Sequence, residues 1–246
     1  MAIPLTLRLE AFAKLSQDDR AALDRISRGS VREVDPRRDL VREGDTPRFV
    51  HLILEGWGCR HKTLPDGRRQ IVALFIPGDF CDLNIYLLKR MDHNIGAITT
   101  MRVAQITRDE MDALTETHPR VTQALWWDDL VSTAVQREWT LNVGQRTAYE
   151  RIGHLLVELY FRLRAVGLAE GQSFDFPLTQ SDVGEATGLT PVHVNRTMKE
   201  LRKDGLLEME RRRATLPDLE RLIEATMFNA TYLHLDREGR HLDAND

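Results

Sequence analysis

The stretch "LTPVHVNRTMKELRKDGLL", Leu189–Leu207, predicts a short amphipathic helix with a marked start and end. Thr190 suits the N-cap because its hydroxyl can accept a backbone hydrogen bond, and Pro191 suits the first helical position because no amide hydrogen is needed there. Gly205 supplies the left-handed residue that ends the helix. Apolar spacings of four and three residues predict a buried stripe of Val194, Met198 and Leu201. The opposite face then carries Val192, His193, Asn195, Arg196 and Lys199.

A second short helix precedes this one, so the two form a predicted helix-turn-helix. Thr179 can cap it with Asp182 as the partner in a capping box, and Gly188 closes it before a tight "GLT" turn. The side chains expected to pack on the buried stripe are Val183, Leu189 and Leu206. In such a pair the free face of the second helix enters the major groove of DNA. Arginine and asparagine suit guanine and adenine edges, whereas hydroxyls, lysine and helix N-termini hold phosphates.

The residues that follow favour this interpretation over a merely solvated helix face. The segment "GLLEMERRRATL", Gly205–Leu216, predicts a strand, a tight basic turn at Arg211–Arg213 and a second strand, as in a winged helix-turn-helix. The arginines of this wing, Arg212 among them, are expected to meet the sugar-phosphate backbone. The preceding "LAEGQSFDFP", Leu168–Pro177, reads as a connector.

The residues from Val31 to Thr107 predict a compact all-β unit. Short β-prone runs alternate with glycines, and "LPDG" at Leu64–Gly67 supplies the turn between two of them. Other strand ends, where positive φ is expected, carry Gly44, Gly56 and Gly78. Consecutive hairpins of this kind indicate a barrel or a roll.

The stretch from Arg120 to about Asn142 holds no glycine or proline and predicts a helix of roughly 23 residues, about 35 Å long. Its first stripe is Ala124, Trp127, Val131, Ala134, Glu138 and Leu141, and its second is Val121, Leu125, Ser132, Val135 and Trp139. A helix that is apolar on two sides needs two partners. We expect these to be the β unit and the same helix of a second subunit, and a helix wrapped within its own monomer is the alternative. A further helix is predicted from Gln145 to about Gly167.

Composition indicates an ordinary soluble protein. The chain has 246 residues, 42% of them hydrophobic, and no window approaches the roughly 18 apolar residues of a membrane span. The N-terminus lacks the basic start and apolar run of a signal peptide, so we expect a cytoplasmic location. The net charge of -4 arises mainly in residues 217–246, with three Lys/Arg against seven Asp/Glu, while residues 177–216 have seven against six. Bulk charge therefore neither supports nor excludes DNA binding.

At this point the chain resembles the bacterial cAMP receptor protein / fumarate-nitrate reduction regulator (Crp/Fnr) family. The segment "LVREGDTPRFVHLILEG" resembles the family's nucleotide-binding β-roll signature, "IPGDFCDL" its ligand-cradle turn, and "LTQSDVGEATGLTPVHVNRTMKELRKDGLL" its reading head. The "LTPVHVNRT" form and the ending "DLERLIEATMFNATYLHL" look like a subgroup common in alphaproteobacteria.

The resemblance implies an α+β fold in three parts. A cyclic-nucleotide-binding-like β-roll (jelly roll) sensor domain spans 1–117, a long dimerisation helix spans 118–144, and a winged helix-turn-helix DNA-binding domain spans 145–246. The implied partners are double-stranded DNA, read as a palindromic operator by a homodimer, and RNA polymerase if the protein activates transcription. We expect no membrane association. An effector would act by changing the spacing of the two recognition helices through a hinge near Asn142–Gln145.

The family also implies roles for individual residues. Arg196 falls at a base-reading position, and its neighbours on the same surface are Asn195, Val192 and Pro191. Phosphate contacts are expected from Thr179, Ser181, Thr190, His193, Lys199 and Arg212. The cAMP-binding branch carries Arg-Glu at the positions of Pro191 and Val192, so this chain should read a different operator.

The effector site departs from the cAMP-binding pattern. The family's Gly-Glu-Leu turn reads Cys81-Asp82-Leu83 here, and its Arg-Ser pair falls on Met91-Asp92-His93, which places a carboxylate where a phosphate would lie. An uncompensated like-charge contact of this kind opposes binding, so we predict no cAMP binding. The possible effector pocket comprises Asp79, Cys81, Asp82, Leu83, Met91, Asp92 and His93.

No cofactor is predicted. An iron-sulfur cluster needs clustered cysteines near the N-terminus, whereas the only two cysteines are Cys59 and Cys81, which we expect to be packed thiols. The histidines His51, His61 and His93 are isolated on strands and are expected to be ordinary hydrogen-bonded groups rather than ligands of a metal or haem.

The alternative function is a cupin-like small β-barrel enzyme or ligand-binding protein with an appended helical domain. A cupin metal site wants two histidines at i and i+2 followed by a nearby glutamate, and no H-x-H occurs. The chain also lacks G-x-S-x-G, a phosphate loop and H-E-x-x-H, so we expect no enzyme activity. A DNA-binding adaptor that works through protein contacts stays open.

Overall fold

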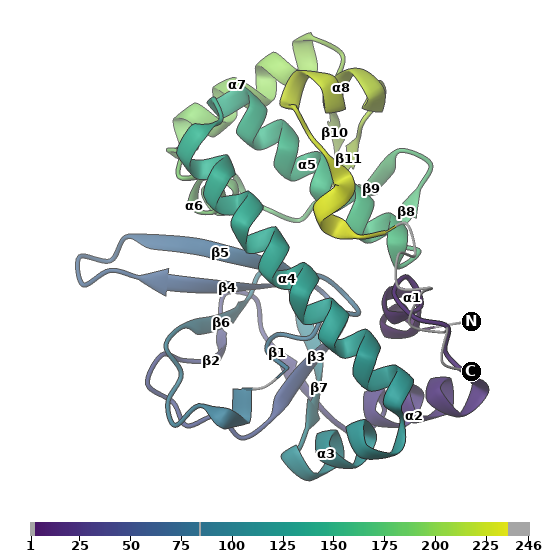
Figure 1. Ribbon diagram of the computed structural model, residues 1–246. Helices are drawn as coiled ribbons and strands as arrows, with labels where there is room; N and C mark the ends of the chain where they lie inside the picture. Colours follow the sequence, from purple (N-terminus) through teal and green to yellow (C-terminus); the bar gives the residue numbers. More distant parts are fainter. Residues whose placement is uncertain (1–2, 84, 236–246) are drawn as a thin grey trace. The chain divides into compact units, whose positions relative to one another are not determined.

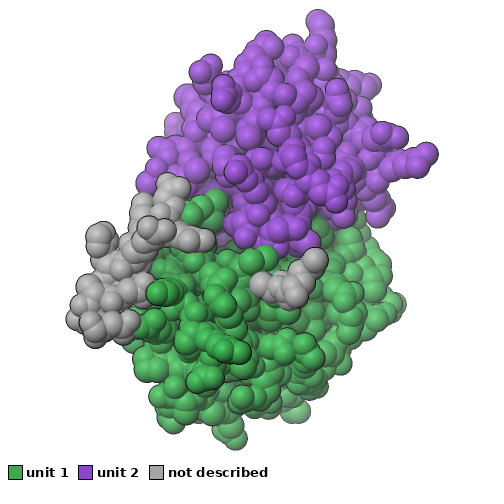
Figure 2. Space-filling model, turned by 90° about the vertical axis from the view of Figure 1, so that its right-hand side faces the viewer, with its two compact units in different colours: residues 1–62, 73–133, 234–246 green, residues 63–72, 134–233 purple. Residues whose placement is uncertain are grey.

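The computed structural model describes residues 3–83 and 85–235 (Figure 1). The chain forms two compact units, coloured separately in Figure 2. The first comprises residues 1–62, 73–133 and 234–246, and the second comprises residues 63–72 and 134–233.

The predicted all-β unit is confirmed, with strands running from Ser30 to Ile106. One antiparallel sheet has the order β1-β7-β3, formed by β1 (Ser30–Val34), β7 (Met101–Ile106) and β3 (Val50–Glu55). The other has the order β2-β6-β4-β5, formed by β2 (Asp39–Val41), β6 (Asn94–Ala97), β4 (Gly58–Thr63) and β5 (Arg69–Phe75). Inward residues such as Leu52, Ile71 and Val103 are fully buried, so the apolar core lies between the strands.

Two of the predicted turns have clear physical causes. The "LPDG" turn closes with Leu64 N donating to Arg68 O at 2.8 Å, and it joins β4 to β5 as expected. Gly56 has φ of 80°, and a Cβ there would lie 2.1 Å from Thr100 O. Only glycine fits that position, because both the backbone conformation and the close approach exclude a side chain.

Short helices complete the first unit: α1 (Pro4–Glu10), α2 (Gln17–Ser27), η1 (Ile85–Leu87) and α3 (Arg108–Thr117). Both α2 and α3 begin with capping boxes, Ser16 with Asp19 and Thr107 with Glu110. Arg8 of α1 is a central tie, since its guanidinium contacts Asp79 at 2.8 Å and Asp128 at 2.5 Å. These ion pairs hold α1 against the turn after β5 and against the long helix that carries Asp128.

The long helix is confirmed as α4 (Pro119–Gln145), but its faces differ from the prediction. Members of both predicted stripes are buried or half-buried against the rest of the chain, with Leu141 the exception. The two stripes therefore form one broad inward face. The large apolar side chains of α4 that remain exposed are Trp126 (67%), Leu130 (65%), Leu141 (47%) and Val143 (38%), and three of these four lay outside the predicted stripes.

The break after α4 lies slightly later than predicted. The helix continues to Gln145, and α5 (Ala148–Ala165) begins after Thr147, whose side chain forms a capping box with Glu150. The expected hinge at Asn142–Gln145 is thus the last turn of α4. The chain changes direction at Arg146 and Thr147 instead, because the cap at Thr147 starts a new helix.

The second unit contains the predicted helix pair and wing: α6 (Gln180–Thr187), α7 (Pro191–Lys203), β10 (Glu208–Glu210) and β11 (Arg213–Thr215). The supposed connector at Leu168–Pro177 is a hairpin of β8 (Ala169–Glu170) and β9 (Ser173–Asp175), which extends the wing sheet in the order β10-β11-β9-β8. The prediction of a connector was wrong: the strands are too short to be recognised in the sequence, yet the segment is packed, since Phe174 and Phe176 are buried.

A buried polar network holds the end of the second unit, formed by α8 (Leu219–Thr226) and η2 (Ala230–Leu233). The Glu158 carboxylate accepts from Trp139 Nε1 at 3.0 Å and from the Tyr232 hydroxyl at 2.8 Å. Burial raises the pKa of Glu158, while the nearby Arg162 opposes that shift. The C-terminal segment is thus tied to α5 by the Tyr232 hydrogen bond and by stacked aromatic rings, and Glu158 links α5 to α4 in turn.

Candidate nucleic-acid interface

The caps of the helix pair are those that the sequence predicted. Thr179 Oγ1 accepts from Asp182 N at 3.2 Å while Asp182 Oδ2 accepts from Thr179 N at 2.8 Å. Gly188 ends α6 in the left-handed conformation with φ of 69°. Thr190 Oγ1 accepts from His193 N at 3.3 Å, and Pro191 is the first residue of α7. These contacts fix where α7 begins and hence which residues occupy its first turn.

The turn between the helices also requires a glycine that the prediction did not single out. A Cβ at Gly184 would lie 2.5 Å from Leu189 O. The backbone of the turn therefore passes directly over α6, which brings α7 close to it. This approach sets the angle between the two helices.

The two faces of α7 are sharply different. The buried face comprises Val194, Met198 and Leu201, as predicted, together with Thr197, which is 1% exposed. On the other face Val192 is 81% exposed, Arg196 and Lys199 are exposed, and His193 and Asn195 are half-buried. The face expected to read DNA is therefore accessible from solvent.

One contact organises the exposed face. Arg196 Nη2 lies 2.9 Å from His193 Nε2, one helical turn away. An arginine can only donate, so His193 Nε2 is the acceptor in this contact. His193, which the family resemblance places at a phosphate, also contacts the guanidinium of the residue expected to read a base.

The wing presents two arginines rather than three. Arg211 and Arg212 are exposed and have φ of 46° and 66°, so they form the tight turn between β10 and β11. Arg213 was predicted in this turn but lies in β11, where it contacts Glu170 at 2.7 Å and Asp175 at 3.6 Å. Its charge is therefore committed within the wing sheet.

The six expected phosphate-contacting residues lie on three elements, α6, α7 and the wing. Thr179 and Ser181 lie exposed at the start of α6, and Thr190 lies exposed at the start of α7. Lys199 lies further along α7, and Arg212 lies in the wing. Backbone amides at helix starts carry partial positive charge, so the first three positions suit phosphate oxygens.

The β4–β5 turn segment also reaches α6 within the second unit. Arg69 Nη1 lies 3.2 Å from Glu185 Oε2, and both side chains are about three-quarters buried. Gln70 Nε2 donates to Ala186 O at 3.5 Å. These two contacts attach the segment 63–72 to α6.

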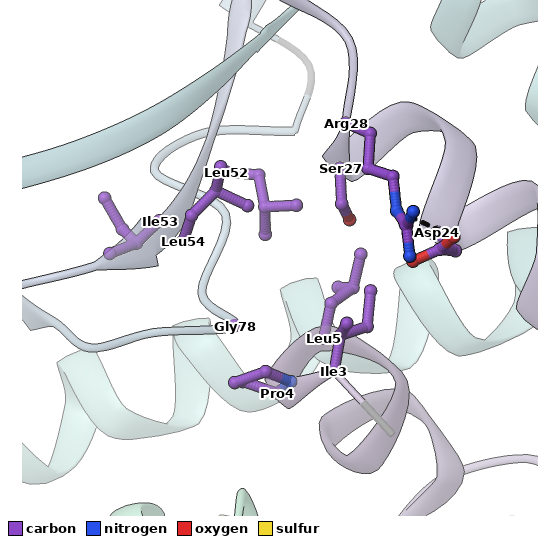
Figure 3. Close-up of a pocket in the computed structure, with 10 residues that line it drawn as sticks. All are labelled: Ile3, Pro4, Leu5, Asp24, Ser27, Arg28, Leu52, Ile53, Leu54 and Gly78. Carbon is purple, nitrogen blue, oxygen red and sulfur yellow. Dashed lines mark hydrogen bonds and ion pairs between the residues drawn. The ribbon is translucent and has the colours of Figure 1, made fainter. Parts of the chain in front are cut away.

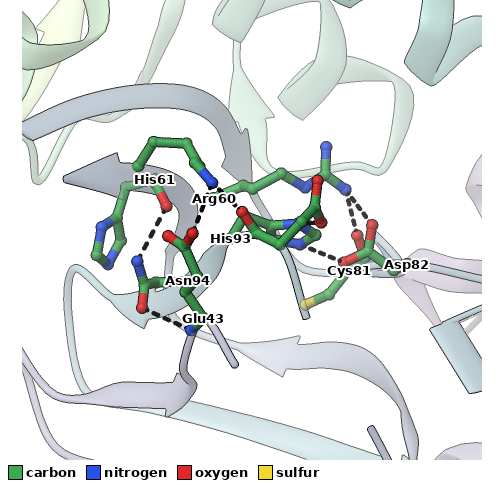
Figure 4. Close-up of polar contacts among 9 residues, drawn as sticks. Glu43, Arg60, His61, Cys81, Asp82, His93 and Asn94 are labelled. Carbon is green, nitrogen blue, oxygen red and sulfur yellow. Dashed lines mark hydrogen bonds and ion pairs between the residues drawn. The ribbon is translucent and has the colours of Figure 1, made fainter. Parts of the chain in front are cut away.

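The expected effector residues form a cluster of charges in the first unit (Figure 4). Asp82 is its centre: its Oδ1 accepts from Arg60 Nη2 at 2.6 Å, and its Oδ2 lies 3.1 Å from His93 Nε2. Asp92 Oδ1 lies 2.7 Å from His93 Nδ1. Arg60, which the sequence argument missed, also donates to Cys81 O at 2.6 Å and lies over the Phe75 ring.

These contacts determine the protonation of the cluster. Burial disfavours charge on His93, but hydrogen bonds and charge from Asp82 and then Asp92 outweigh it, so the pKa of His93 is raised. Burial raises the pKa of the Cys81 thiol well above its usual value, so Cys81 is a packed thiol rather than a reactive one. Asp79 was grouped with these residues but pairs with Arg8 and caps the turn at Ile76.

A separate cavity of about 210 Å³ opens between α1, α2 and β3 (Figure 3). Its walls are mostly apolar, with Leu5, Leu52 and Ile53 among the residues that line it. The two charged lining residues, Asp24 and Arg28, pair with each other at 3.0 Å. Its lining therefore offers no uncommitted cation for a phosphate.

Within residues 3–83 and 85–235, no three His, Cys, Asp or Glu side chains are grouped so as to hold a metal ion. Over the same described ranges, no helix has the length and apolarity to cross a bilayer.

Two family models match the chain: a cyclic nucleotide-binding domain over residues 31–118 and a Crp-like helix-turn-helix domain over residues 150–225. The transcriptional activator protein FnrL of Cereibacter sphaeroides is 29% identical over 216 residues, 86% of each chain. A Rhizobium leguminosarum bv. viciae protein named "Probable transcriptional activator" is 30% identical over 208 residues, 82% of this chain and 85% of that one. The solved structure of FixK2 from Bradyrhizobium japonicum matches with a TM-score of 0.71 and 25% identity, covering 79% of this chain and 96% of that one.

Proposed function

The chain belongs to the Crp/Fnr family of transcription regulators, and from that premise we propose that it reads a palindromic DNA operator as a homodimer through the outward face of α7. It is a regulator with a helix-turn-helix DNA-binding domain, and its relatives are named as transcriptional activators, so the cupin-like enzyme is dismissed. The proposal concerns which residues carry recognition, how many copies act together and whether an effector is needed.

The observation that carries the proposal is the polarity of α7. Its apolar side chains are buried, while Arg196, Lys199 and Val192 project from the other face. A helix N-terminus with arginine and asparagine can enter the major groove and contact base edges. We assign base reading to Arg196, Asn195, Val192 and Pro191. The hydroxyls at the helix starts, with His193, Lys199 and Arg212, then hold the flanking phosphates.

Replacing Arg196 tests the assignment. Arg196→Ala should weaken binding to a selected operator by about 1–3 kcal/mol and leave binding to random duplex nearly unchanged. Lys199→Ala and Arg212→Ala are the matched controls, since each should weaken both duplexes alike and reduce the slope of log affinity against log salt by about one. Equal losses on the two duplexes for Arg196→Ala would argue against base reading.

The homodimer is supported by the exposed stripe of α4. Trp126, Leu130 and Leu141 are each 47–67% exposed and follow one side of the helix at spacings of four and eleven residues. Such spacing places side chains on one helical face, and a second copy of α4 would bury it. Two recognition helices related by this axis would need to lie about 34 Å apart to enter successive major grooves.

We infer that the β-roll does not use cAMP. In the Arg60–Asp82–His93–Asp92 cluster the guanidinium is already paired with a carboxylate of the chain, and a second carboxylate lies beside it. These residues do not fit a cyclic nucleotide, because its phosphate would have to displace Asp82 and approach Asp92. Calorimetry should detect no binding of cAMP or cGMP, and micromolar affinity for either would contradict this. The β-roll is then a fixed scaffold or a sensor of another ligand.

We propose RNA polymerase as a further partner if the protein activates transcription, and a cytoplasmic location to go with these partners. The domain division that we propose assigns 1–117 to the β-roll, 118–144 to the dimerisation helix and 145–246 to DNA binding; residues 1–2, 84 and 236–246 of these ranges lie outside the described residues.

A further inference from the structure

Val192 occupies a position where it contributes nothing to the fold. It lies in the first turn of α7 and is 81% exposed, the highest value among the large apolar side chains of the described residues. Valine is a mediocre helix former, and the start of a helix favours acidic side chains, of which α7 has none in its first turn. Helix propensity, the charge preference of a helix start and exposure to solvent all disfavour valine at this position. Such a residue is expected where function selects it.

The chemistry of the major groove identifies what Val192 can contact. Base edges there present hydrogen-bond donors and acceptors, with one apolar exception, the C5-methyl group of thymine. The N-terminal residues of a recognition helix are those that reach the base edges. Building on the proposed function, we propose that Val192 reads a thymine through its methyl group.

The geometry of α7 also places that thymine. Arg196 is four residues after Val192 and therefore on the same helical face, with Cβ atoms ~5–6 Å apart. Arginine most often pairs with guanine, and base pairs stack at about 3.4 Å. The thymine read by Val192 thus lies within about two base pairs of the guanine read by Arg196, on either strand. Cytosine there would lose the methyl contact and bring its amino group against an apolar side chain.

Deoxyuridine tests this directly, since it pairs with adenine as thymine does and lacks only the methyl. Duplexes are selected from a random library with the full chain, and each thymine of the half-site is replaced singly by deoxyuridine. The guanine read by Arg196 is the one whose substitution weakens binding of the wild type but not of Arg196→Ala. Within two base pairs of it, one deoxyuridine replacement should weaken binding about fourfold, the value of one buried methyl group.

The variant Val192→Ala should reduce this penalty, because alanine retains only one methyl group for the contact, and it should fold as the wild type does, because alanine favours helix. Val31→Ala is the matched control: Val31 is 42% exposed on β1, and its replacement should leave the penalty intact.

The inference is overturned if no deoxyuridine position near that guanine affects binding, if the selected half-site has no thymine there, or if Val192→Ala shows the same penalty as the wild type. Each of these results leaves recognition by Arg196 standing. A library that yields no enriched duplex would overturn the proposed function and this inference together.

Discussion

At the scale of single residues, the chain neutralises its own charges where a nucleotide-binding relative would need them free. Asp82 receives Arg60 on one oxygen and His93 on the other, and His93 contacts a second carboxylate through its other nitrogen. Both ring nitrogens can donate only when the imidazole is charged. The cluster is therefore complete only with protonated His93.

This predicts how stability depends on pH. Because the folded-state pKa of His93 is raised above 6.5, its contribution to stability is fully present below that value and is lost as the pH rises through the folded pKa. The wild type should have a higher free energy of unfolding than His93→Gln, and this difference should be largest at low pH. It should shrink as the pH rises above 6.5. Denaturant titrations across this range measure it.

The control for this measurement is a histidine without the charged neighbours of His93. These neighbours are Asp82, Asp92 and the opposing cation Arg60. The ring of His118 instead contacts the Thr117 hydroxyl, so His118→Gln should not reproduce the trend. A difference between wild type and His93→Gln that is constant with pH would contradict the charged imidazole.

At the scale of elements, the exposed stripe of α4 makes a prediction about assembly. Leu130→Glu should convert a dimer into a monomer in sedimentation experiments, since a buried leucine contributes about 1.5–3 kcal/mol and an unpaired buried carboxylate costs more. Specific DNA affinity should fall with it. Leu64→Glu, at a leucine that is 52% exposed in the β4–β5 turn, should stay dimeric. A wild-type chain that sediments as a monomer at micromolar concentration would contradict the proposed homodimer.

The turn of the helix pair makes a second prediction. Gly184→Ala should destabilise the second unit by roughly 1–3 kcal/mol, because the new methyl group would lie 2.5 Å from Leu189 O and force the turn away from α6. Gly144→Ala is a control of opposite sign: it lies within α4 with nothing within 4 Å of its Cβ, so it should stabilise by about 1 kcal/mol. Thermal unfolding of the two variants compares them, and a neutral Gly184→Ala would show that the turn adapts.

The elements also show where sequence reasoning works and where it stops. Caps such as Thr179 and Thr190 were predictable because each acts within one turn of its own helix. The outward face of α7 was predictable for the same reason, from spacing alone. The hairpin at Ala169–Asp175 was missed because strands of two and three residues are too short to show the alternation of apolar and polar residues that predicts a strand.

Contacts between distant residues were out of reach. Arg60 lies 22 positions before Asp82 in the chain, and only the β-roll brings the two together. Likewise, periodicity located the apolar positions of α4 but not which of them the rest of the chain covers, so Trp126 and Leu130 went unrecognised. Arg213 was placed in the wing turn because its pairing with Glu170 depends on the unexpected hairpin.

At the scale of the whole molecule, recognition of DNA does not require a basic protein. The net charge is -4, yet Lys199 and Arg212 are exposed on the elements expected to approach the phosphates. A local basic face governs association, whereas acidic residues elsewhere act only through a screened field. In a dimer this face would occur twice, so the selected operator should consist of two half-sites with centres about 10–10.5 base pairs apart.

The most direct test is the ratio of the dissociation constants for a selected operator and for a random duplex of the same length, measured with the full chain at about physiological salt. We expect the selected operator to be bound at least about 10³-fold more tightly than the random duplex, as for other specific regulators. A chain that bound the two duplexes equally, or neither of them, would contradict recognition by the outward face of α7.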